Sequence, residues 1–154
     1  MGFLVAAVAE LFDGLDNTVR IFLLGADTWP SFAERVRPHI AKMADGSGGR
    51  FEARDIERAV TSGRMHLWVI MDGLDLACVV VTELHDYPRS RAMRYIGVSG
   101  RRPLRWMHLQ ANIEAAAKLH FGCDRMEALH QPGHERLLRT PGWRQWHILS
   151  EKML

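Results

Sequence analysis

The stretch from Ala92 to Leu119 constrains the fold more than any other part of the chain. Apolar and polar residues first alternate up to Ser99, as expected of a β-strand with two different faces. Gly100 and a run of arginines follow, and apolar residues then recur at spacings of three and four from Leu104 onward, which is typical of an amphipathic helix. The stretch therefore predicts a strand, a tight bend and a helix of roughly four turns.

Three arginines, Arg101, Arg102 and Arg105, cluster at the bend. A helix that starts at the carboxyl end of a strand presents free N–H groups and the positive end of its dipole, and both attract anions. The arginines are consistent with a phosphate or diphosphate site. A solvated basic turn is the alternative, since no further glycine supports a phosphate-binding loop.

An Asp-Gly pair separates two apolar runs, Met65 to Met71 and Leu76 to Leu84. This arrangement is a strong hairpin signal, so the runs are predicted to be antiparallel strands, with the strand that ends at Gly100 as their next partner. The remaining elements follow from periodicity and turn residues. In chain order they are a strand at Thr18–Leu24, a helix capped by Asp27 or Thr28 that reaches Met43 and is bent or interrupted at Pro38, a helix at Phe51–Ser62, a loop at His85–Ala92, a strand at Asp124–Leu129, a helix at Pro132–Arg139 and a strand at Trp143–Lys152.

This order of elements predicts one α/β (α+β) domain over residues 1–154, built on a mixed sheet. The strand that ends at Gly100 and the strand that begins near Asp124 are expected to lie parallel. The helix from Leu104 to Leu119 would connect them as a right-handed crossover.

The composition narrows the class of protein. The chain is 47% hydrophobic and 25% charged, with a formal net charge of only +2, which is ordinary for a soluble globular domain. A general nucleic-acid-binding protein would carry a basic excess with interleaved aromatic residues, so nucleic acid is not an expected partner. Cys78 lies in an apolar run and Cys123 follows a glycine, and both are expected to be reduced thiols.

The N-terminal run is apolar as far as Glu10. It lacks the positive start of a signal peptide and is too short to span a bilayer, so neither secretion by a signal peptide nor a membrane partner is expected. Such a run either adds an edge strand or cap to the domain's own sheet or docks onto a partner surface.

Taken together, the Asp-Gly hairpin, the strand into Val98-Ser99-Gly100-Arg101 and the run from Glu135 to Trp143 resemble the GNAT acetyltransferase superfamily in element order, over nearly the full chain. The resemblance implies a mixed, mostly antiparallel sheet with helices on both faces. It also implies that acetyl-CoA, in an enzymatic member, binds at the bend after the central strand. The residues carried over to that role are Val98, Gly100, Arg101, Arg102 and Arg105.

The bend departs from the family's pattern. In that family two glycine or alanine positions let backbone N–H groups approach the diphosphate of acetyl-CoA. Here the run from Arg101 to Trp106 contains no glycine, and Pro103 removes a donor. The tyrosine that often serves as general acid falls on Leu138, which cannot donate a proton.

The candidate general base is Glu83, on the strand next to the central one, with His85 and Asp86 at its loop end. A carboxylate poised to accept a proton from an amine would suit acetyl transfer. The alternative is that these side chains lie at an ordinary solvent-exposed loop and have no catalytic role.

Two functions follow from the resemblance. The favoured one is a non-catalytic or weakly catalytic protein with no cofactor, resembling the GNAT-like proteins of tailed bacteriophages and located in the virion and the host cytoplasm. It would dock onto phage head or tail components through Phe3, Leu4, Val5 and Val8. The alternative is an acetyl-CoA-dependent N-acetyltransferase that acts on an amine of a small molecule or protein.

Two other possible sites, a nucleophile elbow and a metal site, have weaker support in the sequence. The run Gly97-Val-Ser-Gly resembles a nucleophile elbow around Ser99, but the second glycine comes one residue too early and the sequence places no acid to orient a histidine. Cys123, His130 and His134 could be metal ligands, but Pro132 and Gly133 break the helix that would align the histidines, and a fourth ligand is lacking. No metal is therefore expected.

Overall fold

The computed structural model describes residues 19–130, 142–145 and 149–154 of the chain. The described elements follow the predicted order of a strand, two helices, three successive strands, a helical segment and a further strand. In chain order they are β1 (Val19–Leu23), α2 (Trp29–Asp45), α3 (Ala53–Thr61), β2 (Met65–Asp72), β3 (Asp75–Tyr87), β4 (Ser90–Gly100), α4 (Pro103–Trp106), the 3₁₀ turn η1 (Met107–Leu109), α5 (Gln110–Leu119) and β5 (Arg125–Ala128).

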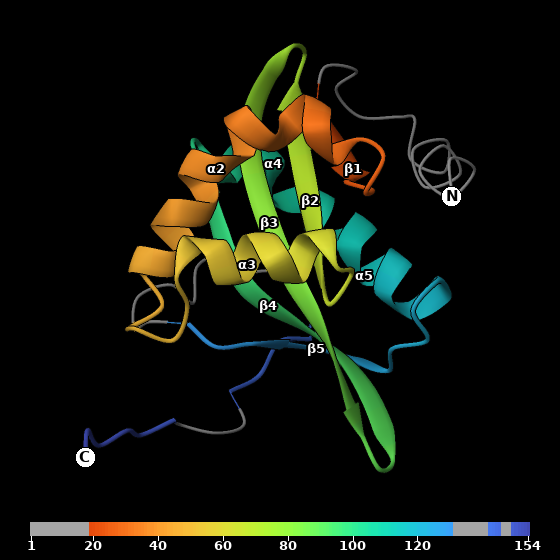
Figure 1. Ribbon diagram of the computed structural model, residues 1–154. Helices are drawn as coiled ribbons and strands as arrows, with labels where there is room; N and C mark the ends of the chain where they lie inside the picture. The colour runs from red at the N-terminus through yellow and green to blue at the C-terminus, as the bar shows by residue number, and fades with distance from the viewer. Residues whose placement is uncertain (1–18, 131–141, 146–148) are drawn as a thin grey trace.

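The five strands form one sheet in the order β1-β2-β3-β4-β5 (Figure 1). The first three pairings are antiparallel, and the turn at Gly73 joins β2 to β3 as the Asp-Gly pair predicts. Among the strands that the structure describes, only β4 and β5 are parallel, and α4, η1 and α5 connect them. This confirms the mixed, mostly antiparallel sheet and the parallel pair that the sequence predicts.

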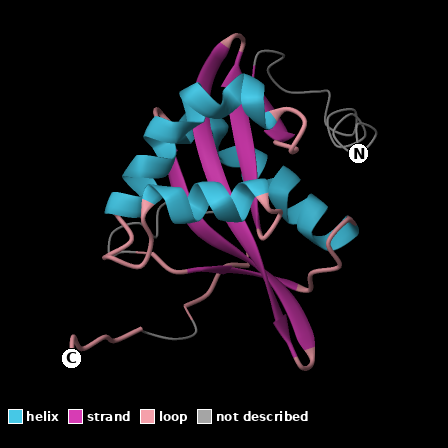
Figure 2. Cartoon of the chain, viewed as in Figure 1, coloured by secondary structure: helices cyan, strands magenta, loops and turns pink. Residues whose placement is uncertain are grey.

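Helices cover both faces of the sheet, as the prediction requires (Figure 2). On one face α2 and α3 pack over Leu67 and Val69 of β2, which alternate with Trp68 and Ile70 on the face of α5. Each face therefore buries its own apolar cluster. Because successive side chains of a strand point to opposite faces, the alternation of β2 fixes which residues meet which helices.

Pro38 lies inside α2 and does not interrupt it, contrary to the expectation of a possible break. The side chains of Val36, Ile40 and Met43 are buried on the sheet side of the helix, while Pro38 is exposed. The apolar stripe on both sides of the proline holds the helix on the sheet, which offsets the missing backbone hydrogen bond.

The predicted loop at His85–Ala92 is wrong. β3 runs to Tyr87 and β4 begins at Ser90, so the turn contains only Pro88 and Arg89. Polar residues extend the ladder because they pair across it: His85 faces Ala92, and Asp86 faces Arg91, with which it forms an ion pair. The result is a long hairpin that projects beyond the rest of the sheet (Figure 1).

Two further boundaries differ from the sequence prediction. The helix expected over Leu104–Leu119 is divided into α4, the turn η1 and α5. Within Trp143–Lys152, the described residues 143–145 and 149–152 form no strand. The helix predicted at Pro132–Arg139 lies outside the described residues.

Candidate functional site

The strands β4 and β5 separate partway along their length. They pair from Ala92 with Arg125 to Tyr95 with Ala128, and beyond Tyr95 the described part of the chain gives β4 no strand partner on this side. A β-bulge lies at the same point. Val81 pairs with Gly97 and Thr82 with Tyr95, so Ile96 is the extra residue of β4. Bulges bend a strand and end its pairing, and they are common beside active sites. We refer to the open side of β4 from Ile96 to Gly100 as the β4 gap.

Backbone groups of β4 face this gap. The N–H of Arg101 donates a hydrogen bond to the carbonyl of Ala77 on β3, at 3.1 Å. Because the backbone groups of alternate residues point to opposite sides of a strand, Val98 and Gly100 direct their N–H and C=O groups away from β3 and into the gap. The exposed side chain of Val98 (40%) adds apolar surface beside it. Such an edge can pair with an extended ligand that carries amide groups.

The bend after β4 offers few free backbone donors. The N–H of Arg101 is used by Ala77, the N–H of Arg105 bonds the carbonyl of Arg102 at 3.0 Å, and Pro103 has none. Arg102 adopts a positive φ of 50°, which is uncommon for a residue other than glycine. An anion at this bend would therefore meet guanidinium groups more than backbone N–H groups.

The three arginines converge as the sequence predicts, but toward β3 and the β2–β3 turn. They line an open depression of about 390 Å³ together with Val19, Asp72, Asp75, Leu76, Ala77 and Trp106. Arg105 forms an ion pair with Asp72 at 3.3 Å. Among the described residues, the guanidinium groups of Arg101 and Arg102 have no carboxylate partner, so their charges remain available to an anion.

Gly100 is required at its position for packing. A Cβ atom built there would lie 2.6 Å from the carbonyl oxygen of Ala77 and 2.8 Å from Cys78. No side chain fits between β4 and β3 at this point without a backbone shift. The glycine therefore sets the path of the chain from β4 into the bend.

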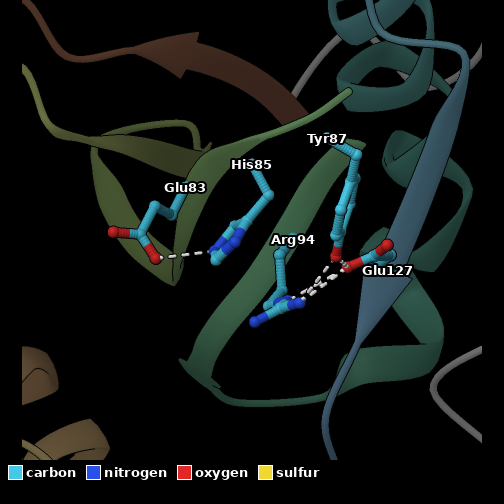
Figure 3. A network of polar contacts seen from close by, with 5 residues as sticks. All are labelled: Glu83, His85, Tyr87, Arg94 and Glu127. Carbon is cyan, nitrogen blue, oxygen red and sulfur yellow. Dashed lines mark hydrogen bonds and ion pairs between the residues drawn. The ribbon is translucent and has the colours of Figure 1, made fainter. Parts of the chain in front are cut away.

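A polar network lies on the α2 and α3 face of the sheet (Figure 3). Glu83, Arg94 and Glu127 stand in register on β3, β4 and β5, one row from the pair of Tyr95 and Ala128. Arg94 Nη2 donates to Glu127 Oε2 at 2.8 Å, and Tyr87 Oη donates to the same oxygen at 3.0 Å. Burial alone would raise the pKa of Glu127, but the hydrogen bonds from Arg94 and Tyr87 hold it below its ordinary value. Glu127 is thus a fixed carboxylate.

Glu83 is held differently from Glu127. Its only partner in this network is His85, whose Nε2 lies 2.9 Å from Glu83 Oε2, and the two side chains remain 29% and 30% exposed. In Figure 3 Glu83 and His85 point toward each other, apart from the group around Arg94. The structure therefore leaves the predicted base, Glu83, accessible and next to a second group that can carry a proton.

Tyr95 is a residue that sequence reasoning did not identify as functional. Its side chain belongs to the apolar cluster on the α5 face, opposite Glu83, and its ring packs against Trp143 with centroids 6.2 Å apart. The hydroxyl is buried without a hydrogen-bond partner in the described structure. Burial, followed by the nearby charge of Glu114, raises the pKa of Tyr95 well above its ordinary value, so the phenol keeps its proton.

The described residues contain no group of three or more His, Cys, Asp or Glu side chains that could hold a metal ion. Of the three possible metal ligands Cys123, His130 and His134, Cys123 is buried and His134 lies outside the described residues. Within the same described part of the chain, no helix has the length and apolar character needed to cross a membrane.

No protein-family model matches the sequence, and no curated protein matches it either. Solved structures do match. A probable acetyltransferase is similar with a TM-score of 0.65 and 13% identity, over 88% of this chain and 96% of that chain. A GCN5-related N-acetyltransferase from Ralstonia eutropha JMP134 is similar with a TM-score of 0.61 and 13% identity, over 88% and 98%. An acetyltransferase from Clostridium acetobutylicum, described as predicted and solved with acetyl-CoA, gives 0.55 and 7%, over 86% and 96%.

These findings overturn the function that the sequence analysis favoured. The three neighbours are acetyltransferases and none is a phage or virion protein, so the interpretation as a non-catalytic virion component is wrong and the enzymatic alternative is the better supported. Docking through Phe3, Leu4, Val5 and Val8 stays a prediction, because these residues lie outside the described ones. At identities this low the likeness concerns architecture, and on that ground the chain has the fold of the GNAT acetyltransferases.

Proposed function

We propose that this protein is an acetyl-CoA-dependent N-acetyltransferase that acts on an amine of a small molecule or protein. The observation that carries the proposal is the β4 gap, which opens at the bulge of Ile96 in a fold shared with acetyltransferases. Bound acetyl-CoA would supply an acetyl group activated as a thioester.

The gap fits the amide-bearing arm of acetyl-CoA. Val98 and Gly100 direct their backbone N–H and C=O groups into it, and the exposed side chain of Val98 adds apolar surface. Amide groups of an extended ligand can therefore be bound as a further strand would be.

The phosphate end would be met by charge. Arg101 and Arg102 are the candidate contacts, because Arg105 is paired with Asp72 and Pro103 offers no N–H. Guanidinium groups bind phosphate through charge-assisted hydrogen bonds, which are stronger than neutral ones. This route does not need the glycines that the bend lacks.

Glu83 is the proposed general base. It is half-buried, carries His85 as its partner, and stands on the α2 and α3 face one row from the point where the strands separate. An amine must lose a proton when it attacks an acyl group, and Glu83 is placed to accept it directly or through His85.

Tyr95 is the proposed proton donor to the departing sulfur. It ends the parallel pairing at the mouth of the gap and lies on the face opposite Glu83. Its buried hydroxyl has no other hydrogen-bond partner in the described structure and retains its proton. An acid and a base thus stand on opposite faces of the sheet at the same point along β4.

The test has two steps. Calorimetric titration of acetyl-CoA into the purified protein is expected to show 1:1 binding. An excess of CoA should displace the bound acetyl-CoA. Incubation with acetyl-CoA and a panel of amines, including polyamines, aminoglycosides and peptides with free N-termini, is then expected to release CoA thiol and an acetylated product. Absence of any binding heat would refute the proposal, since the gap would then not be a donor site.

A further inference from the structure

A serine and a histidine from distant parts of the chain meet beside the β4 gap. Nδ1 of His39, on α2, lies 2.8 Å from Oγ of Ser99, on β4, although 60 positions separate them in the sequence. Ser99 pairs with Val79, which packs in the cluster beneath α2 and α3, so its side chain lies on the α2 face. Acetyl transfer as proposed above uses neither group.

The hydrogen bond has the geometry of a nucleophile with its base. A separation of 2.8 Å is within the range in which a histidine can take the proton of a hydroxyl group. In the neutral tautomer that carries its ring proton on Nε2, Nδ1 of His39 is the acceptor for the hydroxyl proton of Ser99. The sequence could not show this pairing, because His39 and Ser99 are brought together only by the packing of α2 against β4.

The surroundings keep the imidazole unprotonated. Burial lowers the pKa of His39, and the positive charges of Lys42 on α2 and of Arg101 after β4 lower it further, against an interaction with the backbone of Ser99 that acts in the other direction. At neutral pH the ring is therefore free to accept a proton.

The same positive charges suit a developing oxyanion. Lys42 and Arg101 act electrostatically on His39, and the N–H of Gly100, the residue after Ser99, points into the gap because the N–H of Arg101 points to β3. Fixed donors and positive charges near a developing negative oxygen are the main stabilisers of acyl transfer to a hydroxyl.

We propose that Ser99 is a nucleophile activated by His39 and that this pair hydrolyses short-chain acyl esters. The Ser99 oxygen adds to the carbonyl carbon while His39 Nδ1 takes the hydroxyl proton. The bond from the carbonyl carbon to the alcohol oxygen then breaks, the leaving oxygen takes that proton, and Ser99 holds the acyl group as an ester. Water, deprotonated by His39, then attacks this ester, releases the carboxylic acid and returns the proton to Ser99.

The substrate class follows from the site. Ser99 and His39 are both half-buried, and a Cβ added to the nearby Gly97 would already meet the side chain of Met43 on α2. The space beside the hydroxyl is therefore narrow. Acetyl and other short acyl groups fit such a space better than long chains.

The test uses p-nitrophenyl acetate and the full chain, without CoA or any amine, so that its outcome is independent of the proposed acetyl transfer. We expect release of p-nitrophenolate, with a rate that falls at least tenfold in Ser99→Ala and in His39→Asn. Ser90→Ala is the matched control, since this serine lies on the same strand and is expected to leave the rate unchanged. Circular dichroism establishes that each variant is folded.

A second measurement does not depend on any variant. Wild-type protein quenched in acid shortly after mixing with the ester is digested and analysed by mass spectrometry, and one added acetyl group is expected on Ser99. An acetyl group found only on other residues, or a hydrolysis rate in folded Ser99→Ala within twofold of wild type, would overturn the proposal.

Discussion

Tyr95 and Ala128 are the last residues that join β4 to β5. The bulge at Ile96 begins with the next residue of β4, so the end of the pairing and the change in strand direction coincide. Beyond this point the side of β4 that faces away from β3 has no strand partner in the described structure, so its backbone groups can bind a ligand.

Val98→Pro is expected to weaken binding of acetyl-CoA about tenfold, which corresponds to about 1.4 kcal/mol. Proline removes the N–H that faces the gap but no hydrogen bond to β3, and proline is tolerated at edge positions of this kind. Calorimetry on Val98→Pro and on Val98→Ala, which keeps the N–H, separates the backbone contribution from that of the side chain. Equal affinities of the two variants would show that this N–H binds nothing.

The double variant Arg101→Ala with Arg102→Ala is expected to bind acetyl-CoA at least tenfold more weakly at low salt. The two guanidinium groups have no carboxylate partner in the described structure, and the bend has few backbone donors to replace them. Charge contacts at an exposed site are screened, over about 3 Å at 1 M salt, so the difference from wild type should shrink as salt is added. Arg54→Ala with Arg58→Ala, on α3, is the charge-matched control.

Glu83→Gln is expected to lower kcat for acetyl transfer by about 10²-fold to 10⁴-fold, the usual contribution of a general base. The KM for acetyl-CoA should change little, because Glu83 lies outside the gap. Asp86→Asn serves as the control, since Asp86 is on the same strand but is paired with Arg91. Release of CoA thiol measures both constants, and an unchanged kcat in Glu83→Gln would exclude this residue as the base.

The ion pair of Arg94 and Glu127 is expected to stabilise the junction of β4 and β5 by about 1 kcal/mol. Both side chains are about three-quarters buried, and the hydrogen bond between them is 2.8 Å long; charged hydrogen bonds of this kind contribute more than neutral ones. A double-mutant cycle of Arg94→Met and Glu127→Gln, followed by urea unfolding, measures the coupling. The same cycle on the exposed pair Arg125 and Asp124 should give a value near zero.

Stability is expected to fall as the pH drops below about 6.5, the ordinary pKa of histidine. Burial lowers the pKa of His66 in the folded protein, so the unfolded chain takes up a proton first and stability is lost until the pH passes the folded pKa. His66→Phe preserves the aromatic contact with Phe121 and should lose less stability between about pH 7.5 and pH 5.5. His120→Gln, an exposed position, should keep the wild-type dependence; identical curves for all three proteins would contradict the assignment.

The order of elements and the parallel pair could be predicted from the sequence because they depend on local signals. The alternation before Gly100, the Asp-Gly turn and the helical spacing after the bend each describe a single segment. The loop predicted at His85–Ala92 was wrong for the same reason: Pro88 marks a turn, but its sequence does not show how far the strands continue on either side.

The parts of the site that sequence reasoning missed depend on contacts between distant segments. The bulge at Ile96 follows from the register of β3 against β4, and no residue type marks it. Arg105 turns toward β2 because Asp72 pairs with it, although the two lie far apart in the sequence. The partners His39 and Ser99 meet for the same kind of reason, since α2 packs across β4. Tyr95 alone carried a usable signal, as a tyrosine directly before the glycine-containing end of the strand.

Gly97 of β4 and Met43 of α2 limit each other's size. A Cβ atom at residue 97 would lie 2.8 Å from Cγ and 2.9 Å from Sδ of Met43, so a larger residue on the strand is accommodated only by a smaller one on the helix. Methionine is flexible enough to adapt in part, but the two positions are not independent. In related chains they should therefore covary, and the space between β4 and α2 can be enlarged by a smaller residue at position 43.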